Sequence, residues 1–447
     1  MEIFFPIVMI SYLMEFDNLF SKPNRLYFQG YIFSLMIVKG RKCATKIRQL
    51  SIFVDRSLSS FQRFLTQYNW DLNEVIKRMI SILIRELADQ MKIYGCYLIG
   101  LDTFLIAKSG KKMIGVQNWK DHSSNPDRGE YIRGHHWGIG ALISRFSDRF
   151  LCWPILCRLI SGEKEPFLFM TTEDGKAERG QILDAAVAIV YQISLLMGGF
   201  PCDGGPALRA VADAFFSKAP FINPLILKGI HLISRLRWDA VGWDDPPPYS
   251  GRGRPAKRGK KWKLADLIKV FPPHQIDLKL YGKMIRIRYV VRDVWLRDVI
   301  KKVRVVVIEG VRNPILLIST DLSLTPKQII TIYSSRFVLE IAIRDLKGHF
   351  GIGSYQCRVV AGIIRFVHLC CLSFCLWRLA MMPQNRAWLE DGHQEKGFRG
   401  DSYFSFAKAS RSLRRYVIRN LIFSKFASGA ELEKMEDEIR MISRIAA

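Results

Sequence analysis

The sequence predicts an α/β protein, and five stretches of the chain carry that prediction. Residues 20–90 repeat apolar residues at helical spacing, which predicts a helical N-terminal region. Two short apolar runs, 97–102 and 208–213, each end in a carboxylate and are typical of buried strands. Residues 281–319 alternate in hydrophobicity and predict further strands. Thr325 then opens a helix, because the proline after it is tolerated in a first helical turn.

The order of these elements divides the chain into five segments. We expect a helical N-terminal domain with possible DNA binding, the first part of an α/β core, a β-rich insertion, the second part of the core, and a charged helical tail. Their ranges are 1–91, 92–224, 225–324, 325–382 and 383–447. Strand-like runs at 138–144 and 150–155 and a helical run at 178–197 belong to the first part of the core.

Composition limits the classes of protein that this chain can be. It has 447 residues that are 49% hydrophobic, and 67 Lys and Arg against 41 Asp and Glu give a formal net charge of +26. This apolar content excludes a disordered chain, and the length excludes a small disulfide-stapled domain. The surplus of positive charge indicates a polyanionic partner or an anionic membrane surface.

The membrane alternative is the weaker of the two. The apolar run 361–382 is long enough to span a bilayer, but it contains Arg365, His368 and Arg378, so we expect a buried helix. The acidic flanks of the apolar run near the N-terminus do not resemble a signal peptide. The nine cysteines show no zinc-site spacing, so we expect reduced thiols in a cytoplasm. Nucleic acid is therefore the favoured partner.

The helix that begins near residue 326 carries a polar stripe. Its members Tyr333, Arg336, Glu340 and Lys347 are 3, 4 and 7 residues apart, so on a continuous helix they lie within an arc of roughly 60°. The alternative is an exposed face on which Arg336 and Glu340 form an i, i+4 pair, worth a few tenths of a kcal/mol.

Two upstream aspartates make a catalytic function possible. Asp102 and Asp213 end the two apolar runs, and Glu340 would complete a set of three carboxylates. Oxygen ligands of this kind suit Mg²⁺, and a pair of such ions can activate water and stabilise the leaving oxygen of a phosphodiester. Asp203 is a rival second acid, but its glycine-rich surroundings are typical of a turn.

These motifs together resemble a known family. Tyr333-x2-Arg336-x3-Glu340-x6-Lys347 is similar to the Tyr-Arg-Glu-Lys signature of a group of bacterial insertion-sequence transposases with an Asp-Asp-Glu (DDE) active site. Residues 101–103 with 108–112 resemble the first-aspartate motif of that group, and residues 211–216 resemble its second. The resemblance extends from about residue 20 to 380. One departure is Leu101, where relatives commonly have a further acid.

The resemblance implies a fold, an activity and a set of site residues. It implies a ribonuclease-H-like catalytic core, interrupted by a mostly β insertion where the strand-rich segment 225–324 stands. Asp102, Asp213 and Glu340 would hold two Mg²⁺ ions, for which Mn²⁺ can substitute, while Tyr333, Arg336 and Lys347 would contact DNA phosphates.

The activity implied is that of a DNA transposase. It would cleave transposon ends within the terminal inverted repeats and join the 3′ ends to target DNA, working as a homodimer in the bacterial cytoplasm near the nucleoid. The alternative is a DNA-binding protein that derives from a transposase and no longer cuts.

Two basic segments are further DNA-binding candidates. The loop after Pro246–Pro248 resembles the Arg-Gly-Arg core of an AT-hook, which can enter a narrow minor groove; a solvated linker that attracts any DNA is the alternative. Its basic residues are Arg252, Arg254, Lys257, Arg258, Lys260, Lys261 and Lys263. The N-terminal group either touches phosphates or forms a solvated face, and its members are Lys39, Arg41, Lys42, Lys46 and Arg48.

Overall fold

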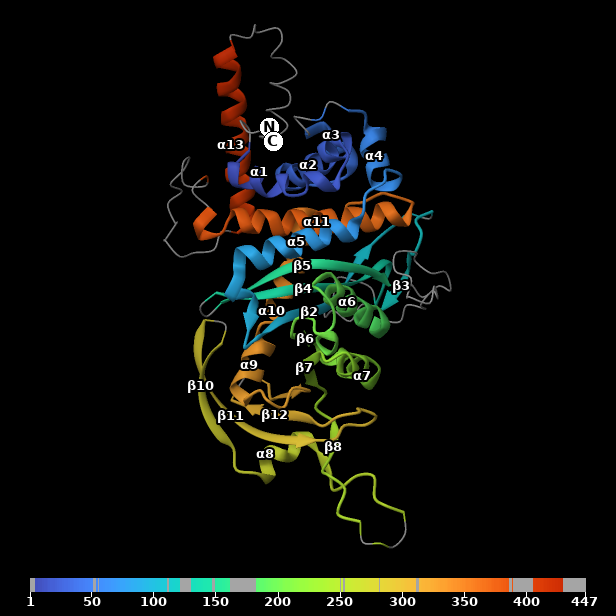
Figure 1. Cartoon of the computed structure of the whole chain (residues 1–447), viewed down its shortest axis with the longest axis vertical. Coiled ribbons are helices and arrows are strands. Elements are labelled where there is room, and N and C mark those ends of the chain that lie inside the picture. The colour runs from blue at the N-terminus through green and yellow to red at the C-terminus, as the bar shows by residue number, and fades with distance from the viewer. Residues whose placement is uncertain are drawn as a thin grey trace. The chain divides into compact units, whose positions relative to one another are not determined.

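Helices before residue 90 and strands after it are both present in the computed structural model of the chain, as the sequence predicts (Figure 1). The structure describes residues 5–50, 54, 56–110, 112–120, 130–146, 149–160, 182–249, 251, 254–280, 282–310, 313–385, 388 and 405–428. The chain forms two units. Unit 1 comprises residues 1–82, 106–134 and 342–447, and unit 2 comprises residues 83–105 and 135–341.

The helices and strands have the following bounds. The helices are α1 Ile7–Met14, α2 Lys22–Ile37, α3 Ala44–Leu50, α4 Leu58–Thr66, α5 Leu72–Leu87, α6 Ile182–Leu196, α7 Ala219–Leu227, α8 Leu267–Val270, α9 Pro326–Ser334, α10 Phe337–Asp345, α11 Val360–Ala380 and α13 Phe406–Ser428. The strands are β1 Lys92–Ile93, β2 Cys96–Ala107, β3 Gln117–Lys120, β4 Tyr131–Phe146, β5 Arg149–Ile160, β6 Leu208–Ala212, β7 His231–Leu236, β8 Val241–Trp243, β9 Lys261–Lys263, β10 His274–Leu280, β11 Lys283–Val294, β12 Val303–Glu309 and β13 Ile315–Ser319.

Unit 1 is a helical assembly in which α2 packs against α11. Most residues of α2 and α11 are buried. Two charged side chains in this assembly donate hydrogen bonds to backbone carbonyls at the ends of helices. Arg365 of α11 donates hydrogen bonds to the carbonyls of Leu65, Tyr68 and Trp70 at and beyond the end of α4. Lys42 is 4% exposed and donates to two carbonyls at the end of α2, so this member of the N-terminal basic group is structural.

Two helices among the described residues are long and apolar enough to cross a membrane by length and composition alone. They are Ile182–Asp203 and Val360–Ala380. The apolar window of the second is 83% buried, against 33% for the first, which agrees with the prediction of a core helix at 361–382. The nine cysteines all lie among the described residues, and no disulfide joins them.

Unit 2 is built on a mixed sheet whose strands run in the order β10-β11-β12-β13-β7-β6-β2-β4. The pairs β2/β6 and β6/β7 are parallel, and those from β10 to β13, with β13/β7, are antiparallel. The segment 225–324 is rich in strands, as predicted. Most of these strands, however, continue the sheet of the core instead of forming a separate one, because β7, the first strand of the segment, pairs with β6 of the core, and β13 pairs with β7.

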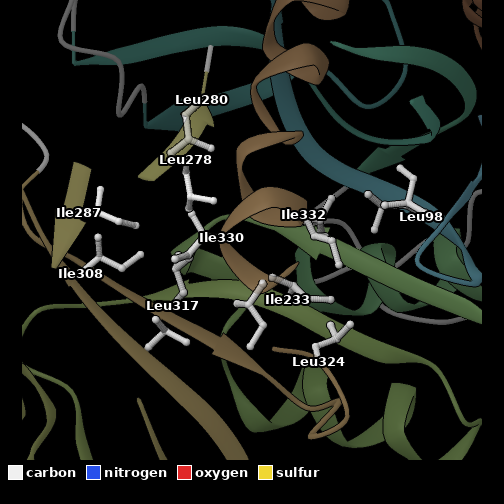
Figure 2. Packing of buried hydrophobic residues seen from close by; sticks show 14 of the residues in the cluster. Leu98, Ile233, Leu278, Leu280, Ile287, Ile308, Leu317, Leu324, Ile330 and Ile332 are labelled. Carbon is white, nitrogen blue, oxygen red and sulfur yellow. The ribbon is translucent and has the colours of Figure 1, made fainter. Parts of the chain in front are cut away.

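Helices cover both faces of this sheet, and two glycines show which helix lies on which face. A Cβ at Gly100 would approach Ile143 and Leu339, so α10 lies over that face. A Cβ at Gly140 would come within 2.3 Å of Ile189, so α6 lies over the other. Figure 2 shows how α9 adds to the core, with Ile330 and Ile332 lying among strand residues such as Ile233 and Leu317.

The helix predicted to run from residue 326 through 347 is in fact broken. Thr325 caps α9 with a reciprocal Thr325–Gln328 capping box, and Pro326 occupies the first turn as predicted. The chain then tightens at Ser335 and Arg336, whose N–H groups bond to carbonyls three residues back, before α10 begins. A π-helical turn, Leu346–Phe350, follows α10 and contains Lys347. The predicted polar stripe assumed one continuous helix with about 100° of rotation per residue. The structure interrupts that helix twice.

Candidate active site

The sheet of unit 2 places the two predicted aspartates side by side. Gly100 and Val211 form the last pair of the β2/β6 register, and Asp102 and Asp213 each follow two residues beyond that pair. The prediction that Asp102 ends its strand is wrong, because β2 continues to Ala107. The pairing with β6 nevertheless stops at Gly100, since β6 ends at Ala212 and the chain turns away. Asp102 thus projects where the partner strand has ended, on the face of the sheet that α10 covers.

Asp213 is held by the turn that follows its strand. One of its carboxylate oxygens accepts a hydrogen bond from the N–H of Phe215 at 2.9 Å, which caps a short 3₁₀ turn. Its carbonyl accepts a hydrogen bond from the hydroxyl of Ser234 at 2.7 Å, which ties it to β7. Both contacts fix the backbone and leave carboxylate oxygen available for another partner.

Arg336 joins the first aspartate to the glutamate. Its Nη1 donates to Oδ2 of Asp102 at 3.2 Å, and its Nη2 donates to Oε1 of Glu340. The i, i+4 pair of the exposed-face alternative therefore exists, but that alternative gives no reason for a contact with a residue 234 positions upstream. The tight turn at Ser335 and Arg336 directs the guanidinium toward the sheet, where its side chain is only 18% exposed.

The charges of the other two acids act on Asp102. Its pKa is raised to about 6, chiefly by burial and also by the charges of Asp213 and Glu340, while the N–H of Thr103 and the Arg336 guanidinium oppose the rise. Because Asp213 and Glu340 both influence this pKa, the three predicted carboxylates share one region of unit 2. Glu340 remains 43% exposed and faces solvent.

A tyrosine and a second arginine complete this cluster. Burial raises the pKa of Tyr333, although the nearby guanidinium groups of Arg336 and Arg235 act to lower it. Arg235 was not predicted from the sequence. It lies near the end of β7, where the pairing of Ala212 with Ser234 aligns it with Asp213. The sequence does contain a signal that could have pointed to Arg235, because this charged residue interrupts the apolar run that forms β7.

The three acids have the chemistry to bind a hard divalent cation. In the structure, an arginine bridges two of them. All three acids offer carboxylate oxygen, which is the ligand type that such cations prefer. Among the described residues, however, no three His, Cys, Asp or Glu side chains are gathered closely enough to hold one metal ion. Arg336 supplies the positive charge between Asp102 and Glu340 instead.

The predicted basic loop forms an arm with a fixed base. Arg252 lies outside the described residues, whereas Arg254, Lys257, Arg258, Lys260 and Lys261 are all exposed. At the base, β8 pairs with β9, which contains Lys261 and Lys263. Arg258 and Lys260 lie 4.2 and 4.1 Å from the ring centroids of Trp243 and Trp262. These cation–π contacts hold the cationic side chains at the surface.

The remaining predicted residues lie elsewhere. Lys347 is exposed in the π-helical turn of unit 1, and the DNA contact expected of it stays a prediction. Asp203 is exposed in a 3₁₀ turn, Pro201–Asp203, that Gly204 closes in a left-handed conformation. This is the ordinary turn role that the sequence suggested, so Asp213 is the better second acid.

Comparison with known proteins bears on this cluster. Residues 207–376 match the family model described as a transposase DDE domain. The matched range begins after Asp102, and it contains Asp213, Tyr333, Arg336 and Glu340. No curated protein matches the chain.

Proposed function

Because the chain carries a transposase DDE domain over residues 207–376, we propose that it is a DNA transposase that uses Asp102, Asp213 and Glu340. It cleaves transposon ends within their terminal inverted repeats and joins the freed 3′ ends to target DNA. The substrate is double-stranded DNA, and the protein works as a homodimer at paired ends in the bacterial cytoplasm.

One observation carries this proposal. Arg336 bonds to both Asp102 and Glu340, while Asp213 acts electrostatically on Asp102. The three acids belong to separate parts of the sequence, so only tertiary folding brings their charges together. An acid whose pKa is raised by burial and by two neighbouring acids is energetically costly, and groups with perturbed pKa values are concentrated at functional sites.

The residues of the chain have distinct parts in the proposed reaction. Asp102, Asp213 and Glu340 would hold two Mg²⁺ or Mn²⁺ ions, which when bound supply water activation and stabilisation of the leaving oxygen. Arg336, Tyr333 and Arg235 surround the acids and suit the DNA phosphates on either side of the cut. Water replaces the 3′ oxygen at phosphorus in cleavage, and a 3′-hydroxyl does the same at target DNA in joining. Neither step requires a covalent protein intermediate.

Arg336 would change partner during this sequence. In the structure its guanidinium neutralises Asp102 and Glu340. A guanidinium released from these two acids would be available to a DNA phosphate. The basic arm supports DNA binding at a second place, and the net charge of +26 favours any DNA by counterion release.

A nicking assay on supercoiled plasmid tests the proposal. Wild type should nick with Mg²⁺ or Mn²⁺ and not with a chelator, and Glu340→Gln should bind DNA in a gel shift without nicking it. Glu309→Gln is the matched control, because Glu309 lies in the same unit on β12 and pairs with Arg288 outside the cluster. Nicking by Glu340→Gln at the wild-type rate would refute the assignment.

The second candidate is a DNA-binding protein that no longer cuts. It is favoured by the same ion pairs, since a guanidinium that occupies both acids leaves no ready-made metal site among the described residues. This candidate predicts that wild type and Glu340→Gln shift DNA equally and that neither nicks it with either ion.

A further inference from the structure

An exposed tryptophan stands at the tip of the turn between β7 and β8. The N–H of Ala240 bonds to the carbonyl of Arg237 at 3.1 Å, so residues 237–240 form a tight turn with Trp238 at its second position. Trp238 is 45% exposed. Turn tips favour small or polar residues, so this large aromatic side chain is unusual there and leaves part of its ring in contact with water. The position therefore points to a role in binding.

The turn lies next to the acid cluster along β7. Arg235 is aligned with Asp213 by the β6/β7 register, and Trp238 follows three residues later. At about 3.3 Å per residue, Trp238 is at most about 10 Å from Arg235. A nucleic acid strand covers that length with about three nucleotides. A strand bound at the acids would therefore reach the tryptophan.

The turn is also held in a fixed position. The carbonyl of Ala240 accepts a hydrogen bond from the N–H of Leu264 at 3.0 Å, and β8 begins at the next residue and pairs with β9. β8 leads directly into the basic arm, so the turn connects the cluster to the arm along the chain. A base-stacking side chain on a rigid support loses little entropy on binding.

The charges beside Trp238 match the backbone of the same strand. Arg235 and Arg237 are both exposed and flank the turn. An aromatic ring stacks on any base that has left the duplex, and guanidinium groups hold the neighbouring phosphates. Paired bases are shielded within their own stack, so an exposed ring of this kind selects unpaired nucleotides.

We propose that Arg235, Arg237 and Trp238 form a surface for the DNA end, on which Trp238 stacks against an unpaired base close to the cut. This inference rests on the proposed function, because it takes DNA as the substrate of the acid cluster. It adds that the preferred DNA has nucleotides unpaired beside the scissile phosphate.

Two short duplexes of equal length serve as probes, one blunt and one with a few unpaired nucleotides at one end. Trp238→Ala should lose about tenfold in affinity for the tailed duplex and little for the blunt one, and Trp238→Phe should retain most of the affinity. Arg237→Gln should weaken both and lower the salt dependence by about one phosphate contact. A 2-aminopurine in the tail should be quenched by wild type and not by Trp238→Ala.

Lys301→Gln is the matched control. Lys301 is exposed and acts on His231 at the opposite end of β7, so its removal should leave the preference for the tailed duplex unchanged. If Trp238→Ala binds and quenches the tailed duplex as wild type does, the inference is overturned while the nicking result stands. If wild type binds neither duplex and does not nick plasmid, the proposed function fails as well.

Discussion

Replacing Asp102 by asparagine should stabilise the protein at neutral pH while removing its activity. The pKa of Asp102 is about 6 in the folded protein against 3.8 for the ordinary group, chiefly because of burial. A folded pKa above the unfolded value means that the contribution of this group to stability is present below about pH 4. It is lost as the pH rises through about 6. At pH 8 the ionised carboxylate therefore destabilises the folded state.

The size of the effect follows from the shift. About two pKa units correspond to about 3 kcal/mol, and weakening the hydrogen bond from Arg336 offsets about 1 kcal/mol of that gain. A net gain of about 2 kcal/mol should raise the Tm of a domain of about 200 residues by about 4–8 °C at pH 8. The gain should vanish near pH 4, where Asp102 is already protonated in the wild type.

Calorimetry with a chelator present, at both pH values, measures this difference. Asp277→Asn is the control, because Asp277 is an exposed acid of the same unit whose pKa is lowered by its hydrogen bonds with Arg286. It should give no stabilisation at pH 8. The reasoning would be refuted if the Tm of Asp102→Asn did not exceed that of wild type at pH 8, or if the gain in Tm persisted at pH 4. Either result would mean that the ionised carboxylate of Asp102 does not destabilise the folded state.

Two further predictions concern stability. Arg209 and Asp321 form an ion pair whose side chains are only 8% exposed. Asp321→Asn should therefore lower the free energy of unfolding in urea by about 3 kcal/mol, because it leaves a buried charge without its partner. The double variant Arg209→Met with Asp321→Leu should lower it by less than either single change. Although burial opposes it, hydrogen bonds from Ser323 and Arg209 hold the pKa of Asp321 below its ordinary value, so this stability should be lost as the pH falls below about 4. Gly140→Ala should cost about 1–3 kcal/mol, because its Cβ would lie 2.3 Å from Ile189, whereas Gly348→Ala, with open space around it, should leave the Tm nearly unchanged.

The elements of the fold were predictable because their signals are local. The Thr325–Pro326 start of α9 needs only a capping residue and a proline, and the structure has both in those roles. The apolar run before Asp213 becomes β6 with every residue buried. Asp213, Glu340 and Tyr333 could be named because the spacing within a motif is a property of the sequence.

The pattern misled where tertiary packing changed local structure. A regular helix was the simplest account of residues 326–347, but the chain tightens at Ser335 and Arg336 so that the guanidinium reaches the sheet. Asp102 was placed at a strand end, whereas β2 runs on because Phe104 and Ile106 continue the alternating buried pattern. The periodicity of a sequence describes one helix or strand at a time. It contains no information about the neighbouring elements whose packing ends or extends that helix or strand.

The sequence by itself determined the surplus of positive charge and predicted the three acids and the order of helices and strands, because each depends on residue type and short-range spacing. Only the tertiary structure decided that Arg336 binds Asp102, that Arg235 joins the cluster, and that the β-rich segment continues the core sheet through the pairing of β7 with β6. Those three outcomes depend on which strands become neighbours. Pairing between strands far apart in the chain is fixed by burial and hydrogen bonding in three dimensions.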